Sequence, residues 1–102
     1  MLPLGVNVIS LKGLRQQIEA HRDCESAALD WFNVARDAQW NSLQDLRLSY
    51  PSADQVGGVL IFNLRGNAYR LIVGVNYAAK TMYVKALLSH AEYTKQEWMK
   101  WC

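Results

Sequence analysis

The spacing of apolar residues changes near residue 59, from a helical repeat to the two-residue repeat of β-strands. Within Cys24–Trp40, apolar side chains recur three or four residues apart, which predicts a helix with Asp23 as its N-cap. A capping-box pattern that begins at Ser42 predicts a shorter helix after it. The first half of the chain is therefore expected to be largely helical.

Two elements are predicted at the start of the chain. Val6–Ile9 has the composition of a short strand, and Ser10 is placed to cap a helix whose apolar residues follow at helical spacing. His21 is expected on the exposed side of that helix. An N-terminal short strand and three helices are thus expected to precede the second half.

Three segments of the second half alternate between apolar and polar residues and are joined by short turns, at residues 59–64, 69–77 and 81–89. This arrangement predicts an antiparallel meander. The preceding stretch, PSADQVGG, is rich in turn-forming residues and is expected to be a loop. Trp98 and Trp101 are expected to pack a C-terminal helix onto the sheet, which gives an α+β fold.

Alternation sorts the strand side chains onto two faces. The apolar face is expected to include Tyr69 and its alternate neighbours, together with Met82, Val84, Ala86 and Leu88. The opposite face is expected to gather polar and basic side chains at Asn63, Arg70, Asn76 and Lys85, with Arg65 beside them at a turn. Such a patch suits phosphate, but a sheet with one wet side predicts the same pattern.

Charge is unevenly distributed along the 102 residues, although the net charge is only +2. The part after residue 60 contains six Lys and Arg residues against two Glu residues, a net charge of +4, whereas residues 1–60 have a net charge of −2. A basic half is a weak indication of a polyanionic partner. The alternative is scattered, solvated charge.

Several classes of protein are disfavoured by the rest of the composition. The apolar runs are far shorter than a membrane-spanning helix, and no export signal is recognisable, so a cytoplasmic protein without membrane contact is expected. Cys24 and Cys102 are distant and have no metal-ligand spacing relative to each other or to the histidines. We expect neither a disulfide nor a metal site.

The segment SHAEYTK, Ser89–Lys95, has two compatible interpretations. Ser89 and Glu92 have the spacing of a helix cap, which is a purely structural role. His90 and Tyr93 stand three residues apart, so the first turn of a helix would present both on one side. The segment alone does not separate a cap from a chemical site.

Several motifs in order along the chain resemble the HigB toxin family, whose members are ribosome-dependent mRNA interferases of type II toxin-antitoxin modules. They are PSAD from Pro51, the pair Phe62-Asn63, GNAYRL from Gly66 and HAEY from His90. The resemblance covers nearly the whole chain. Two departures are Ser89, where the family pattern leads us to expect threonine, and Thr94, where it leads us to expect aspartate.

The resemblance implies one RelE-like toxin domain over residues 1–102, which cleaves mRNA on the translating ribosome and is restrained by a cognate antitoxin. No metal or cofactor is implied. In metal-free cleavage the 2′-hydroxyl attacks the adjacent phosphate, so a base, an acid and positively charged donors are needed. The expected catalytic residues are His90, Tyr93, Arg70 and Lys95, and the expected RNA-binding residues are Arg65, Asn67, Lys85 and Asn63.

Roles within this set are only partly distinguishable. Arg70 is the best phosphate clamp, because a guanidinium offers two parallel donors from a rigid strand. His90 is the first candidate for base or acid, because imidazole titrates nearest to neutral pH. Tyr93 and Lys95 remain alternatives for either role.

Two other functions stay open at this point. RelE-like proteins include toxins that inhibit gyrase, a protein target, instead of cutting RNA. A non-catalytic RNA-binding or protein-binding module would use the same basic face without an acid or base. Retention of Arg70, His90 and Tyr93 together favours the nuclease.

Overall fold

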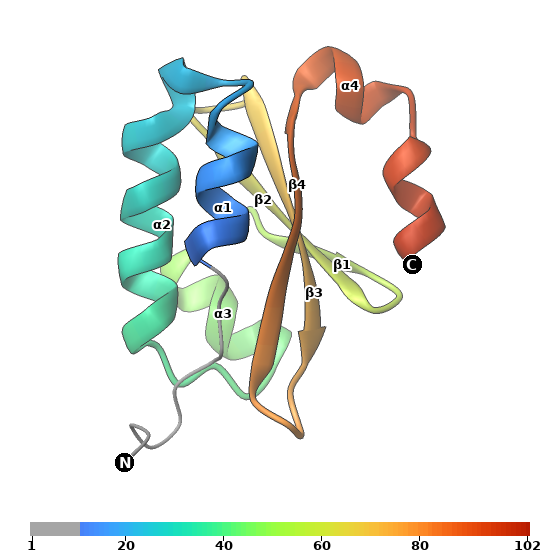
Figure 1. The fold of residues 1–102 in the computed structure, drawn as a ribbon. Helices are drawn as coiled ribbons and strands as arrows, with labels where there is room; N and C mark the ends of the chain where they lie inside the picture. Colours follow the sequence, from blue (N-terminus) through green and yellow to red (C-terminus); the bar gives the residue numbers. More distant parts are fainter. Residues whose placement is uncertain (1–10) are drawn as a thin grey trace.

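Helices and the C-terminal segment lie on opposite sides of one antiparallel sheet (Figure 1). The computed structural model describes residues 11–102. The helices of the first side are α1 (Leu11–Ile18), α2 (Glu25–Asp37) and α3 (Leu43–Ser49). The predicted α+β architecture is confirmed, while the strand predicted at Val6–Ile9 and the cap predicted at Ser10 lie outside the described residues.

The sheet has strand order β1-β2-β3-β4, and every neighbouring pair is antiparallel. Its strands are β1 (Asp54–Val56), β2 (Val59–Leu64), β3 (Tyr69–Asn76) and β4 (Thr81–Ser89). The predicted meander is confirmed, but the prediction that PSADQVGG is all loop is wrong, because its middle forms β1. Gly57 adopts a φ of +58°, which lets the chain reverse tightly between β1 and β2.

The helix boundaries differ from the prediction at both ends of α2. It is preceded by a 3₁₀ turn, η1 (Arg22–Cys24), and it ends at Asp37 and not at Trp40. Cys24 stands at the N-cap position and Asp23 does not cap the helix, because its carboxylate is engaged with Tyr69 and Arg65. The cap predicted at Ser42 is confirmed: its Oγ accepts from the backbone N–H of Asp45 at 3.2 Å.

The larger apolar cluster fills the space between the helices and the sheet. Its centre is aromatic: the Phe62 ring lies 5.3 Å from that of Trp31, 5.4 Å from Tyr50 and 6.1 Å from Trp40. Trp31 and Phe62 are completely buried. This cluster fixes α2 and α3 against β2 and so holds the sheet rigid beneath its other face.

A β-bulge interrupts the pairing of β3 with β4. Ile72 pairs with Ala86 and Val73 pairs with Val84, so Lys85 is left as an extra residue between them. A bulge of this kind bends the strand and shifts its alternation by one residue. Lys85 stays on the face opposite the helices, where its Cε lies next to the position that a side chain at residue 74 would occupy.

The bulge corrects one part of the predicted facing. Leu87, which alternation along β4 assigns to the second face, lies in the helix-side cluster and is 2% exposed. Ala86 and Leu88 lie on the opposite face, where Leu88 packs against a second cluster. The prediction that Ala86 and Leu88 share the face of Met82 is therefore wrong.

The polar residues of the second face suggested that it is fully exposed to water. In the structure, part of this face is covered. A smaller apolar cluster there contains Val59, Ile61, Ile72 and Trp98, all buried. Trp98 comes from the C-terminal segment, formed by α4 (His90–Thr94) and the 3₁₀ turn η2 (Glu97–Trp101). The expected packing of the terminal tryptophans onto the sheet is confirmed, with η2 in place of a longer helix.

Candidate active site on the second face of the sheet

Arg70 lies at the centre of a layered arrangement on the second face. It is paired with Asn63 across β2 and β3, and its guanidinium carbon lies 5.1 Å from the centre of the Tyr93 ring. Tyr93 in turn stacks on Trp98, with ring centres 5.1 Å apart and planes only 6° from parallel. The buried Trp98 thereby holds Tyr93, and Tyr93 supports the guanidinium.

Backbone carbonyls orient the same guanidinium. Arg70 Nη1 donates to the carbonyl of Asn67 at 2.8 Å and to that of Tyr69 at 3.3 Å. Within residues 11–102 Arg70 has no carboxylate partner, so its positive charge is not neutralised locally. An oriented cation of this kind is suited to an incoming phosphate.

The Ser89–Lys95 segment is both a helix cap and a neighbour of Arg70. Ser89 Oγ accepts from the N–H of Glu92 at 3.2 Å, and Glu92 Oε1 accepts from the N–H of Ser89 at 2.8 Å, a complete capping box. The N–H of His90 donates to the carbonyl of Ala68 in the β2–β3 turn at 3.0 Å. The cap therefore places His90 beside the turn that leads to Arg70.

Thr94, where an aspartate was expected, points its hydroxyl back at His90. Its Oγ1 donates to the His90 carbonyl at 2.8 Å and lies 3.5 Å from Nδ1 of the exposed imidazole. This contact is too long to fix the ring strongly, so His90 is held mainly by its backbone. A hydroxyl also brings no charge to the imidazole, unlike the carboxylate expected there.

His21 reaches this segment from the helical side of the molecule. Its Nε2 lies 2.8 Å from Oε1 of Glu92, and its ring lies 5.2 Å from that of Tyr69. The pKa of Glu92 is held below its ordinary value, first by the hydrogen bond from the Ser89 N–H and then by His21. Sequence reasoning placed His21 on an exposed helix surface and missed this pair, because 71 residues separate the partners.

Arg65 is directed away from Arg70. One of its nitrogens donates to the Asp23 carbonyl at 3.1 Å and to its Oδ2 at 3.0 Å, while the Tyr69 hydroxyl donates to Oδ1 at 2.5 Å. The Tyr69 hydrogen bond is the main cause that lowers the pKa of Asp23, with smaller contributions from a backbone hydrogen bond and the Arg65 charge, and the same Tyr69 bond raises the pKa of Tyr69. In this structure the charge of Arg65 is therefore already paired.

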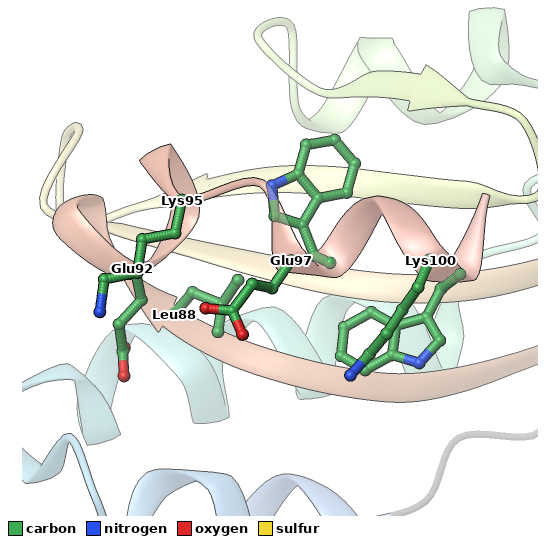
Figure 2. A pocket seen from close by; sticks show the side chains of 7 residues that line it. Leu88, Glu92, Lys95, Glu97 and Lys100 are labelled. Carbon is green, nitrogen blue, oxygen red and sulfur yellow. The ribbon is translucent and has the colours of Figure 1, made fainter.

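The other predicted residues lie at different distances from Arg70. Asn63 is its direct neighbour across the strands, and Asn67 contributes a backbone carbonyl. Lys85 lies over Gly74, which is four residues along β3 and so about 13 Å from Arg70. Lys95 lies just beyond α4 and lines a separate pocket, shown in Figure 2.

Neither a metal-ligand cluster nor a membrane-spanning helix is found in the described part of the chain. Among residues 11–102, no three His, Cys, Asp or Glu side chains come close enough together to hold a metal ion. Every helix in the same range is too short or too polar to cross a bilayer. Cys24 is a buried free thiol, and burial raises its pKa to about 11.

Comparison with known proteins identifies the class to which this fold and site belong. Residues 24–96 match the HigB toxins, RelE-like toxic components of toxin-antitoxin systems. Because this match spans most of the chain, the protein belongs to the HigB toxin family, and the resemblance seen in its motifs is confirmed. Membership of a toxin-antitoxin family implies an antitoxin partner.

A curated relative is the mRNA interferase HigB of Escherichia coli (strain CFT073). The two proteins are 25% identical over 67 residues, an alignment that covers 63% of this chain and 65% of the relative. The chain therefore aligns with slightly less than two-thirds of that protein. The family match over residues 24–96 contains the sheet that carries Arg70.

Proposed function

We propose that this chain is a ribosome-dependent mRNA interferase, which inhibits translation by cutting mRNA. The observation that carries the proposal is the Arg70–Tyr93 contact, with His90 at the start of the same helix. This contact joins a guanidinium and a phenol on the second face of the sheet, and His90 stands in the first turn of the helix that carries Tyr93. Family membership and the name of the E. coli relative support the same activity.

The proposed reaction is transfer of the phosphoryl group to the adjacent ribose hydroxyl. The 2′-hydroxyl loses its proton to a base, its oxygen bonds to phosphorus, and the bond to the 5′-oxygen breaks as that oxygen is protonated. The products are a 2′,3′-cyclic phosphate and a free 5′-hydroxyl. Arg70 would stabilise the charge that grows on the phosphate oxygens, because its donors are already oriented.

His90, Tyr93 and Lys95 are the groups proposed for proton transfer. His90 is exposed at the start of α4, so its imidazole is accessible to a substrate from solvent. Tyr93 lies against Arg70, so its phenol is close to a phosphate held by that guanidinium. Lys95 follows the last residue of α4. Its ammonium could either transfer a proton or bind a flanking phosphate.

The test is cleavage of a defined mRNA on programmed ribosomes, with the new 5′ ends mapped. Arg70→Ala is expected to reduce the cleavage rate about 10² to 10³-fold, the usual effect of losing one such donor. Arg70→Lys keeps the charge but not the fork, so it should restore activity only in part. Arg36→Ala, on the exposed side of α2, is the matched control and should cut as the wild type does.

Each outcome bears on a different function. A folded Arg70→Ala protein that cuts at the wild-type rate would remove Arg70 from the reaction. A wild-type protein that binds ribosomes and leaves mRNA intact would favour a non-catalytic RNA-binding module. Inhibition of gyrase without any effect on mRNA would favour the protein-directed toxins.

A further inference from the structure

A pocket of about 220 Å³ lies between β4 and the C-terminal segment, next to the candidate active site. Its floor includes Leu88, and one wall is Trp98, the same ring on which Tyr93 stacks. The pocket is therefore separated from the Arg70 guanidinium by only two aromatic rings. The pocket is thus close enough to Arg70 to receive a nucleotide next to a phosphate held there.

The pocket is lined by two glutamates and two lysines. Figure 2 shows Glu97 reaching toward Leu88, with Lys95 on one side of it and Lys100 on the other. Glu92 also lines the pocket, but its Oε1 already accepts from Ser89 and faces His21. The Glu97 carboxylate has no hydrogen-bond or ion-pair partner within residues 11–102, so its two oxygens remain available for a ligand.

This mixture of charges restricts what the pocket can bind. A bare phosphate would meet two carboxylates, and an aliphatic group would desolvate four charged side chains without pairing them. A planar heterocycle with hydrogen-bond donors on its edge avoids both problems, because it carries no negative charge and its donors can pair with a carboxylate. The volume is below the range of about 300–1,000 Å³ that is typical of drug-sized sites, as expected for one ring system.

We propose that the pocket binds an unpaired guanine base of the mRNA, with Glu97 accepting from its N1–H and N2–H₂ groups; this inference rests on the proposed function. Unpaired bases are commonly recognised in this way, by aromatic contact and by hydrogen bonds to the Watson–Crick edge. Only guanine offers a carboxylate two adjacent donors. Adenine and cytosine each offer one amino group beside an acceptor, and uracil offers one imino group between two carbonyls.

Trp101 supplies the stacking surface. Its ring is partly exposed, and Nζ of Lys100 lies 5.2 Å from the ring centre. A base that enters the pocket takes the place of this ammonium over the indole. The flexible Lys100 side chain then reaches the flanking phosphate, and Lys95 lies at the opposite end for the next phosphate.

The first experiment uses the free protein and single nucleotides. Guanosine 5′-monophosphate is titrated into isotope-labelled protein while the indole N–H resonance of Trp101 is followed, and the 5′-monophosphates of adenosine, cytidine and uridine are compared with it. Guanosine should bind most tightly. Glu97→Ala should weaken guanosine binding about tenfold or more and remove the preference, as expected for loss of a bidentate base contact.

Two controls separate base recognition from structural damage. Met99→Ala alters an exposed residue of the same turn that does not line the pocket, and Glu25→Ala removes an equal charge on α2. Both should bind guanosine as the wild type does. Trp101→Phe keeps a smaller stacking surface and should bind more weakly with the same preference for guanine.

The second experiment maps mRNA cuts on ribosomes for the wild type and Glu97→Ala. The wild type should favour guanine at one fixed position near the cut, and the variant should lose that bias while still cutting. Equal response to all four nucleotides, or an unchanged bias in Glu97→Ala, overturns the guanine pocket and leaves the proposed nuclease intact. If the wild type does not cut at all, the proposed function fails, whereas the nucleotide titration still reports on the pocket.

Discussion

Removal of the His21 side chain should loosen the helix that carries the candidate catalytic residues. Glu92 is an acceptor when ionised, so Nε2 of His21 carries the proton in the 2.8 Å contact between them. None of the residues of α4 is buried, and within residues 11–102 its links to the rest of the protein include the Ala68 contact, the Arg70–Tyr93 contact, the Tyr93–Trp98 contacts and this pair. His21 is the link to the helical layer.

The expected effect of His21→Ala is small, because both side chains of the His21–Glu92 pair are partly exposed to water. The His21 side chain is 15% exposed and that of Glu92 is 47% exposed, so water screens the pair substantially. Partly exposed pairs of this kind contribute about 0.5–1 kcal/mol. His21→Ala should therefore raise the population of detached α4 about two- to fivefold. His21→Gln, which keeps a donor, should show a smaller change.

Amide hydrogen exchange measures this detachment directly. In His21→Ala, exchange should quicken for α4 and leave the β3 amides unchanged, and the cleavage rate should fall by no more than the same factor. The carboxyl titration of Glu92 supplies a second readout: its pKa should rise toward the ordinary 4.5 but stay below it, because the Ser89 N–H remains. Identical α4 exchange in wild type and variant would refute the reasoning.

Two further predictions concern stability. Phe62→Ala should lower the free energy of unfolding by about 3–5 kcal/mol in denaturant titration, because it leaves a cavity among three aromatic rings, whereas Val34→Ala, at an exposed site, should change it little. Stability should also fall at both pH extremes. The lowered pKa values of Asp23 and Glu92 stabilise the fold above their ordinary values of 3.8 and 4.5, and this contribution is lost as pH falls through the lowered values. The raised pKa of Cys24 stabilises the fold below pH 9.0, and that contribution is lost as pH rises toward about 11, so an unchanged unfolding midpoint from pH 8 to pH 11 would contradict it.

The fold was predictable wherever the apolar pattern was strong and local. Strands of six to nine residues and a capped helix have a recognisable spacing of apolar and capping residues, so β2, β3, β4 and the Ser42 cap were predicted correctly. β1 was missed because three residues, two of them polar, carry no measurable alternation. The bulge was missed because Ala86, Leu87 and Leu88 are all apolar, so a shift by one residue leaves no trace in the pattern.

The residues of the candidate site were predictable from the motifs, but their tertiary contacts were predictable only in part. The motifs led to Arg70, His90 and Tyr93, and the structure brings Arg70 and Tyr93 into contact, although their roles remain a proposal. Arg65 illustrates what spacing does not reveal. Its φ of +49° at the turn and its pairing with Asp23 direct the side chain to the helical side. Contacts between residues so far apart in sequence depend on tertiary geometry, which no local pattern encodes.

The two apolar clusters of the sheet differ in size, and this difference divides the molecule into a strong and a weak cooperative unit. The helix-side cluster contains most of the buried side chains, whereas the cluster under the C-terminal segment contains four, of which only Trp98 comes from that segment. Partial unfolding is expected to begin at the smaller unit. The proposed cleavage activity would then be lost while the sheet and helices remain intact, because Tyr93 and His90, its candidate residues, belong to the part that detaches first. An inhibitor that holds α4 away from the sheet would stop the proposed activity without denaturing the protein.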